Sequence, residues 1–516
     1  MNGEEIVKKF EESKTYRTNF ENLYKSAYEH FMPQRSKAFG QSGDSTNGQP
    51  NDGQDVVFDS TPLDALNKFV SKLQSSLVPA QQQWCKLRVG TAIDDNIEEK
   101  QRVLDQINDI FFAAIHNSNF DVEVSECFYD LAVGTACLMM IDSGSFNEPF
   151  KFKTVPLSEL YLENVGNSQF GGIFRCHSVI PMLANQVWTD IKMNKEMAEE
   201  GKPQEFIEYV AKEKNGKYTY YVVYNKTKSI VVQRSLEYNP FIVFRWSVMP
   251  GEVYGRGPVL FALPDAKSLN KTKELILKNA SLAVSGAYTY EDDGVTNPEN
   301  VAVEPGAFIP VASNGGQSRA PSIAPLRSGA DFNVGDIVLK DLRQSIYQIM
   351  FANPMGPIDT PVRSATEIEY RQKEFADTIG APFGRLQTEL IKNIIANGLT
   401  ILNSINKIDI GQFKVNGEEI AVRYSSPLAI TQESEKVMKM RTFLSTIAEM
   451  FGPQVAMSVI KTTMIPKLAA GMGIDMNDVA TSDELEEMKN NAADAEAQQA
   501  EQENQIRMMN AQAQAK

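Results

Sequence analysis

Apolar side chains at helical spacing predict two helices in the first eighty residues. The first is expected at residues 2–31. The second is expected to begin at Asp59 or Ser60, either of which can cap a helix, and to stop at Pro79. Residues 41–54, between these helices, are mostly Gly, Asn, Asp, Gln and Ser and predict a loop. The apolar faces are Phe20, Leu23, Tyr24, Ala27 and Phe31 in the first helix and Leu63, Leu66, Phe69, Leu73 and Leu77 in the second.

The pattern between residues 84 and 246 is mixed and predicts an α+β body. A helix is expected near Glu98–Asn117. Four short apolar runs are typical of strands, at residues 136–141, 173–180, 218–224 and 241–244.

Two further helices are expected on either side of an insert. Residues 265–284 predict a helix with an apolar side and a side on which three lysines line up, Lys267, Lys271 and Lys278. Residues 286–329 are rich in Gly, Pro, Asn and Ser, which is typical of an irregular or small β-containing subdomain. A second helix is expected at residues 334–350, with four apolar side chains on one side: Val338, Leu342, Ile346 and Ile349.

Proline and glycine interrupt the chain after this unit. Residues 351–363 contain three prolines and predict a loop that includes Asn353, Pro354, Pro357, Pro361 and Arg363.

A capping box at residues 364–367 predicts the start of a long helix that runs towards Ile405. Gly380 and Pro382 lie in its middle, where the missing N–H and the ring of proline predict a kink.

The C-terminal part is expected to be mainly helical. A β-prone piece at residues 413–424 is followed by expected helices at 433–451 and 454–470. Between residues 485 and 513, steps of three and four define a heptad seam of mostly small side chains. Both a barrel of helices built from many copies and a frayed polar tail are consistent with this seam.

Length and charge limit the classes of protein that fit. The 516 residues suit two to four segments, and 51 basic against 66 acidic residues give 51 − 66 = −15. A protein that binds phosphate over its whole surface is therefore excluded, and any contact with nucleic acid must be local. No run approaches about 18 apolar residues and the N-terminus has no apolar signal region, so neither a membrane span nor a signal peptide is expected.

The cysteines do not form a recognisable metal or disulfide pattern. The four are far apart without a Cys-x-x-Cys pair, and the chain has only three histidines. A zinc cage and a disulfide framework are both unsupported, which favours buried, unreactive thiols in a reducing cytoplasm. These are Cys85, Cys127, Cys137 and Cys176.

The usual catalytic signatures are missing as well: the phosphate loop, the nucleophile elbow and the His-Glu-x-x-His pair. Glu291, Asp292 and Asp293 could hold Mg²⁺, but adjacent acids in a turn-rich insert are more simply solvated. The glycines of residues 254–258 could approach a phosphate, but a turn before the next helix is the simpler interpretation. No catalytic residue, metal or cofactor is expected.

The order of these elements resembles the portal, or head-to-tail connector, proteins of short-tailed bacteriophages. Four stretches carry the resemblance, at residues 58–87, 128–142, 253–281 and 364–391. It implies an α+β, mainly α, portal fold that assembles as a ring, usually of twelve subunits, at one capsid vertex. Double-stranded DNA passes through the axis of such rings during packaging and ejection.

The resemblance also implies a division of the chain. It comprises a wing (1–264), a first stem helix (265–284), a clip (285–330), a second stem helix (331–350), a tunnel loop (351–363), the kinked long helix with the rest of the wing (364–430), a helical crown (431–480) and a C-terminal barrel or tail (481–516).

Partners and location follow from the same resemblance. It implies contact with a terminase motor, tail adaptor proteins, the major capsid protein and internal core proteins, in a virion assembled in the host cytoplasm and without a membrane. DNA contacts would come from Lys267, Lys271, Lys278 and Arg363, although the lysines could equally form salt bridges between subunits or a solvated face. Two other hypotheses stay open: a phage adaptor or minor head protein without a channel, and, more distantly, a metal-dependent enzyme.

Overall fold

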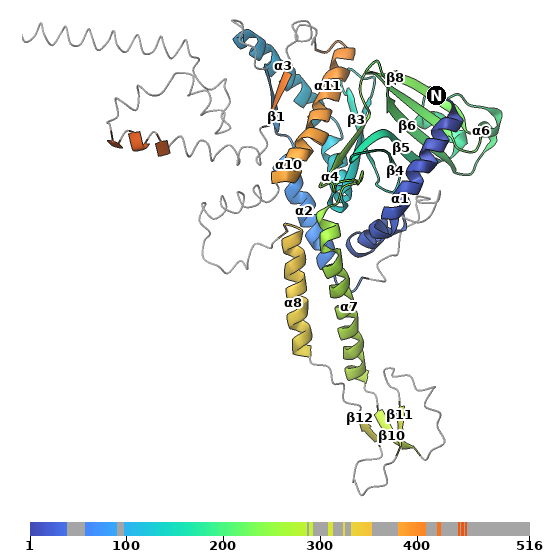
Figure 1. Ribbon diagram of the computed structural model, residues 1–516, viewed down its shortest axis with the longest axis vertical. Coiled ribbons are helices and arrows are strands. Elements are labelled where there is room, and N and C mark those ends of the chain that lie inside the picture. The colour runs from blue at the N-terminus through green and yellow to red at the C-terminus, as the bar shows by residue number, and fades with distance from the viewer. Residues whose placement is uncertain are drawn as a thin grey trace, which may run out of the picture. The chain divides into compact units, whose positions relative to one another are not determined.

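The computed structural model describes most of the chain up to residue 424 (Figure 1). The described residues are 1–38, 57–89, 97–285, 288–292, 308–312, 323–325, 332–352, 380–408 and 420–424, with short helical pieces between 442 and 450. The chain forms two compact units, of which the first comprises residues 1–75, 89–361 and 380–420, and the second comprises 76–88, 362–379 and 421–516.

A five-stranded antiparallel sheet forms one part of the first unit. Its order is β4-β5-β6-β7-β8, so each strand pairs with the next along the chain. The strands are β4 (Leu160–Gly166), β5 (Gln169–Val179), β6 (Gln204–Lys212), β7 (Tyr218–Tyr224) and β8 (Ser229–Leu236). Between β5 and β6 lie the short turns η3 (Pro181–Leu183), α5 (Ala184–Val187) and α6 (Lys195–Glu199).

The long first helix, α1 (Gly3–Phe31), packs on one face of this sheet. Ile6 and Phe10 of α1 share a buried cluster with Phe174, Ile207 and Tyr209 of the strands. Because side chains alternate along a strand, their neighbours Arg175 and Glu208 point to the opposite face. The polar alternation of β5 and β6 thus gives the sheet a second, charged face.

A three-stranded sheet, ordered β3-β2-β9, forms the other β layer of this unit. It contains β2 (Thr135–Asp142), β3 (Phe150–Val155) and β9 (Phe241–Arg245). Side chains bind backbone groups on both of its edges. The Asn119 amide accepts from the Phe152 N–H at 2.9 Å and donates to the Phe152 carbonyl at 2.8 Å. Glu123 accepts from the Thr154 N–H at 2.6 Å, and Glu389 accepts from the Arg245 N–H on the other edge at 2.9 Å.

The helices around this sheet are partly as expected. The predicted first three helices are confirmed as α1, α2 (Thr61–Leu77) and α3 (Ile97–His116), with a short turn η1 (Pro33–Ala38) after α1. The predicted apolar runs are confirmed as β2, β5, β7 and β9. The helix α4 (Phe120–Val133) was not expected. Its buried side includes the acidic Asp130 and its exposed side includes the apolar Val122, so polar and apolar residues are not cleanly separated into two faces in the sequence.

The helix–insert–helix unit is also confirmed. Helices α7 (Pro258–Ser285) and α8 (Phe332–Ile349) lie side by side (Figure 1). The chain between them contains a small sheet of order β11-β10-β12, made of β10 (Tyr288–Asp292), β11 (Phe308–Ala312) and β12 (Ile323–Pro325). The insert therefore contains β structure, as its composition indicates.

Two details of this unit correct the expectations. Helix α7 begins at Pro258 rather than at residue 265, because proline suits the first helical position. Pro264 lies inside the helix, where its ring is exposed and only one backbone hydrogen bond is lost. On α8, Val338 is exposed although it was expected to pack, and the buried side chains are Leu339 and Ile346, followed by Met350 directly after the helix.

Residues 380–404 form one helical stretch, which ends close to the expected end. It consists of α10 (Gly380–Leu386), a π-helical turn η5 (Gln387–Ile391) and α11 (Lys392–Ser404). Gly380 and Pro382 lie in the first turn of α10, and the residues just before them are outside the described part, so the kink stays a prediction. The π-helical turn has no counterpart in the sequence pattern.

The described part of the second unit includes most of two paired strands. These are β1 (Cys85–Val89) and β13 (Ile420–Tyr424), and β13 lies within the expected β-prone piece. The expected loop at 41–54, the proline loop with Asn353, Pro354, Pro357, Pro361 and Arg363, and the heptad seam lie outside the described residues. Among the residues that the structure describes, none of the helices combines the length and the apolar character needed to span a bilayer.

Candidate functional site

The lysine face predicted on the first helix of the hairpin is present on α7. Lys267, Lys271 and Lys278 are all exposed, and the side chains of the latter two are 65% and 67% exposed. Glu274 lies between these two on the same face and accepts from Lys271 Nζ at 2.9 Å and from Lys278 Nζ at 2.7 Å. Hydrogen bonds from Lys278 and then Lys271 lower the pKa of Glu274. The cationic face is thus partly neutralised within one chain.

The charge of α7 remains positive after this correction. The helix carries four lysines and two acids, 4 − 2 = +2, in a chain whose total is −15. Lys267 makes no ion pair with any described residue. The role of Glu274 was missed, although its spacing of three and four residues from the two lysines is a readable signal.

Apolar side chains flank the lysines. Leu275 and Leu277 are 49% and 46% exposed. At about 100° per residue, Leu275 lies about 60° to one side of the mean lysine direction and Leu277 about 100° to the other. Ile337 on α8 is exposed as well. Large apolar side chains left uncovered on both sides of a polar stripe are typical of a surface that another protein covers.

Three side chains of α8 bind neighbouring parts of the unit. Each donates to a carboxylate. Arg343 Nη2 is 2.6 Å from Asp59 Oδ2, and Tyr347 Oη is 2.7 Å from Asp64 Oδ2 at the start of α2. Ser345 Oγ is 2.6 Å from Asp265 Oδ2 on α7. These carboxylates therefore have hydrogen-bonding roles that fix α8 against α2 and α7.

Asp59 is the most buried of these acids. Burial opposes ionisation of its carboxyl group, but hydrogen bonds from Arg343 and Thr61 outweigh it and lower the pKa of Asp59. Asp59 also accepts from the Thr61 N–H at 3.0 Å, so it takes part in the start of α2. The expectation that Asp59 or Ser60 caps this helix is consistent with that contact.

Glycines position the first turn of α7. The Gly257 N–H donates to the Val133 carbonyl at 2.8 Å, and a Cβ on Gly257 would lie 2.1 Å from the Ala132 carbonyl oxygen. A Cβ on Gly255 would lie 2.3 Å from the carbonyl oxygen of Gly134. The glycines of residues 254–258 therefore allow two backbone segments to touch. They form the turn before the helix, as expected, rather than an open loop around a phosphate.

The chemistry of the cysteines agrees with the sequence interpretation. All four are free thiols, and Cys127 and Cys137 are fully buried. Burial raises the pKa of both thiols. Within the described residues, no three His, Cys, Asp or Glu side chains gather in a way that could hold a metal ion. Glu291 and Asp292 lie in β10, and Asp293 is outside the described part.

The family model and the related proteins that match this chain are described in similar terms. A family model described as bacteriophage head to tail connecting protein matches residues 3–479. The portal protein of Enterobacteria phage T3 is 23% identical over 444 residues, which are 81% of this chain and 78% of that protein. The portal protein of Escherichia phage T7 is 23% identical over 448 residues, covering 82% and 80%. Among solved structures, the neck of an empty GTA particle is 10% identical with a TM-score of 0.35, covering 82% of this chain and 92% of that one.

Proposed function

Because this chain belongs to the family of bacteriophage head-to-tail connecting proteins, we propose that it is a portal protein. In this role, copies of the chain close into a ring, a dodecamer in the family's usual form, that joins the phage head to the tail and conducts double-stranded DNA. The single observation that carries the proposal is the family match, which extends over residues 3–479.

The proposed division of labour follows the order of elements. Residues before α7 form the wing, α7 and α8 the stem, the insert between them the clip, and residues 351–363 a tunnel loop. Residues 364–430 complete the wing, 431–480 form the crown, and 481–516 extend it. The helix start at Pro258 moves the proposed wing–stem boundary from residue 264 to 257. A terminase motor and later tail adaptors would bind the clip, core proteins the crown, and the major capsid protein the outer side.

The exposed faces of α7 support a channel role. In a closed ring each helix has a neighbour on both sides, and Leu275 and Leu277 are the uncovered side chains that such neighbours would bury. The lysines between them would then face the axis, and each would repeat once per subunit. The lysines of all subunits would then form bands of positive charge around the channel. Because Glu274 pairs with two of the three lysines, these lysine bands would bind the DNA backbone only weakly, and weak binding lets DNA pass through the channel. This role is mechanical and requires no catalysis by the chain.

Electron microscopy of the purified full-length protein tests assembly directly. We expect rings with a central hole that admits a B-form duplex. A stable monomer at micromolar concentration would contradict the proposal, and so would a filament without a channel.

Charge variants test the contact with DNA. The triple change Lys267→Ala, Lys271→Ala and Lys278→Ala should leave rings intact, reduce retention of DNA and flatten its dependence on salt. Glu274→Gln should have the opposite effect, because it frees two lysines. A control with the same loss of charge replaces three exposed lysines of the wing with Ala: Lys202, Lys214 and Lys217.

Three outcomes are informative. Equal DNA retention in the two triple variants would place the lysines away from the DNA. Loss of rings only in the α7 variant would place them at the subunit interface. If Glu274→Gln weakened retention, the lysine bands would not face the DNA at all.

A further inference from the structure

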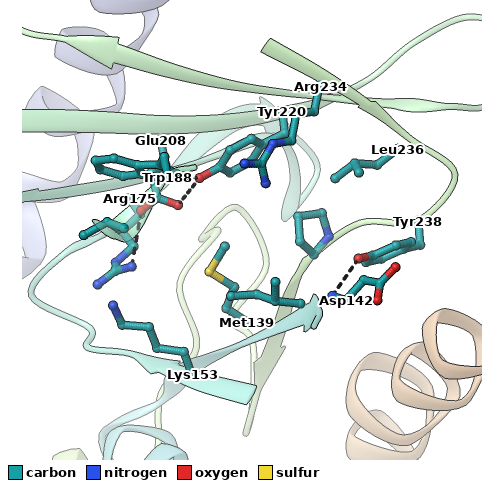
Figure 2. Close-up of a pocket in the computed structure, with 13 residues that line it drawn as sticks. Met139, Asp142, Lys153, Arg175, Trp188, Glu208, Tyr220, Arg234, Leu236 and Tyr238 are labelled. Atoms are coloured by element: carbon teal, nitrogen blue, oxygen red, sulfur yellow. Dashed lines mark hydrogen bonds and ion pairs between the residues drawn. The ribbon is translucent and has the colours of Figure 1, made fainter. Parts of the chain in front are cut away.

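A half-open cavity of about 180 Å³ lies between the two sheets of the first unit (Figure 2). Arg175, Glu208 and Tyr220 of the five-stranded sheet line one side of it, and Met139 and Lys153 of the three-stranded sheet line the other. The charged face of β5 and β6 described above therefore faces this space.

The charged lining consists of three cationic side chains, Lys153, Arg175 and Arg234, and two carboxylates, Asp142 and Glu208. Glu208 accepts from Tyr220 Oη at 2.8 Å and from Arg175 Nη1 at 3.3 Å, and Glu159 accepts from Arg175 Nε at 2.8 Å. Arg175 Nη2 and Lys153 Nζ, by contrast, have no hydrogen bond to any residue that the structure describes. Figure 2 shows the ammonium group of Lys153 pointing towards Arg175. Lys153 and Arg175 thus share one space with the Glu208 carboxylate, which already accepts from Arg175 and Tyr220.

The remaining wall of the cavity is mostly apolar and aromatic, and its charged members are Asp142 and Arg234. The indole N–H of Trp188 donates to Tyr220 Oη at 3.0 Å, which fixes the ring at the side of the cavity. Arg234 is engaged with Asp190 through Nε at 2.7 Å, so it adds little free charge. The apolar lining side chains are Ile141, Val187, Leu236 and Pro240, with Tyr238 next to them.

We propose that this cavity binds a carboxylate carried on an apolar body of roughly the size of one amino-acid residue. The carboxylate would accept from Lys153 Nζ and Arg175 Nη2, a charge-assisted arrangement, and the apolar body would lie against Trp188 and its neighbours. Burial and then the charge of Arg175 lower the pKa of Lys153, and a bound anion would relieve this destabilisation of the ammonium form. Such a carboxylate could belong to a free small acid or to the C-terminus of a peptide. The inference does not depend on ring assembly.

Titration calorimetry with 3-phenylpropanoate on the full-length protein tests the proposal. We expect saturable binding that is at least tenfold weaker for the uncharged analogue 3-phenylpropanamide. Lys153→Met removes the ammonium group while keeping an apolar stem, and it should weaken binding of the acid at least tenfold without changing that of the amide. Lys151→Met is the matched control, because Lys151 is, like Lys153, an exposed lysine of the same strand but does not line the cavity.

A second pair of probes separates the two sources. If the tripeptide Gly-Gly-Phe binds more tightly than the free acid and its C-terminal amide does not bind, the cavity takes a peptide terminus; the reverse order indicates a free acid. Binding of the acid and the amide with equal affinity would overturn the proposal. Absence of binding by all four probes at millimolar concentration, or equal loss in the two lysine variants, would overturn it as well.

Discussion

The glycine contact beneath α7 predicts a large effect for a single methyl group. In Gly257→Ala the new Cβ would lie 2.1 Å from the Ala132 oxygen, whereas real Cβ contacts are essentially never under 3.0 Å, so the segments must separate by at least 3.0 − 2.1 = 0.9 Å. This movement breaks the 2.8 Å hydrogen bond from the Gly257 N–H to the Val133 carbonyl. Leaving a buried polar group unpaired lowers the free energy of unfolding by about 1–3 kcal/mol, and overpacking lowers it by about 1–3 kcal/mol. We therefore expect Gly257→Ala to lower the free energy of unfolding by about 2–6 kcal/mol.

The control is the same substitution at an open site. Gly384 lies in α10, and no atom of the described residues beyond its chain neighbours and its own helix backbone lies within 4 Å of the position that an added methyl group would take, so Gly384→Ala should stabilise that helix by about 0.5–1 kcal/mol. Hydrogen exchange followed by mass spectrometry, together with the guanidinium midpoint, measures both variants. We expect Gly257→Ala to lose protection in the first turns of α7 and in the α4–β2 turn. Unchanged protection there, with a midpoint equal to that of Gly384→Ala, would refute the steric argument.

Three further outcomes follow from buried titratable groups. Burial and then the charge of Arg175 hold the pKa of His177 well below 6.5. The folding stability of the protein is therefore unaffected by this group above pH 6.5 and falls by about 1.4 kcal/mol per pH unit below it, because the unfolded chain then binds a proton that the buried imidazole does not. Denaturation curves of wild type and His177→Gln should separate at pH 5.5 but not at pH 7.5, and parallel behaviour at the two pH values would contradict this. The lowered pKa of Asp59 means that its bond to Arg343 contributes above pH 3.8 and is lost as pH falls further. Asp59→Asn should therefore reduce protection of α8 at pH 7 by about 1–3 kcal/mol and change little at pH 2, and an equal effect at both would argue against the ion pair. Cys127 should resist iodoacetamide at pH 8 until the protein is denatured, and rapid labelling of the native chain would show that its thiol is accessible.

Helices with one buried face were predictable because their apolar spacing is itself the packing signal. The first three predicted helices and the α7–α8 hairpin are of this kind. Helix α4 shows where such spacing is harder to recognise, because the buried side includes the acidic Asp130 and the exposed side includes the apolar Val122. The early start of α7 was missed for a different reason, since Pro264 inside a sequence normally argues for a boundary.

The candidate sites differ in what the sequence could reveal. The lysines of α7 are visible as a periodic pattern, and so, in retrospect, is the partner Glu274. The cavity is not visible in this way. Lys153 and Arg175 stand on strands of different sheets, and only the alternation and register of those strands turn both towards one space. The spacing of residues along one strand or helix does not show which residues of another element they approach in the fold.

The side chains bound at the edges of the three-stranded sheet have a consequence for crowding. Asn119 and Glu123 occupy the backbone groups of β3 that a strand from another molecule would need, and Glu389 does the same at the Arg245 N–H of β9. A strand from another molecule would have to displace these side chains before it could pair at those positions. Wrong association through intermolecular strand pairing is disfavoured there, and contact between molecules is left to side-chain surfaces, whose shape and charge can select one geometry.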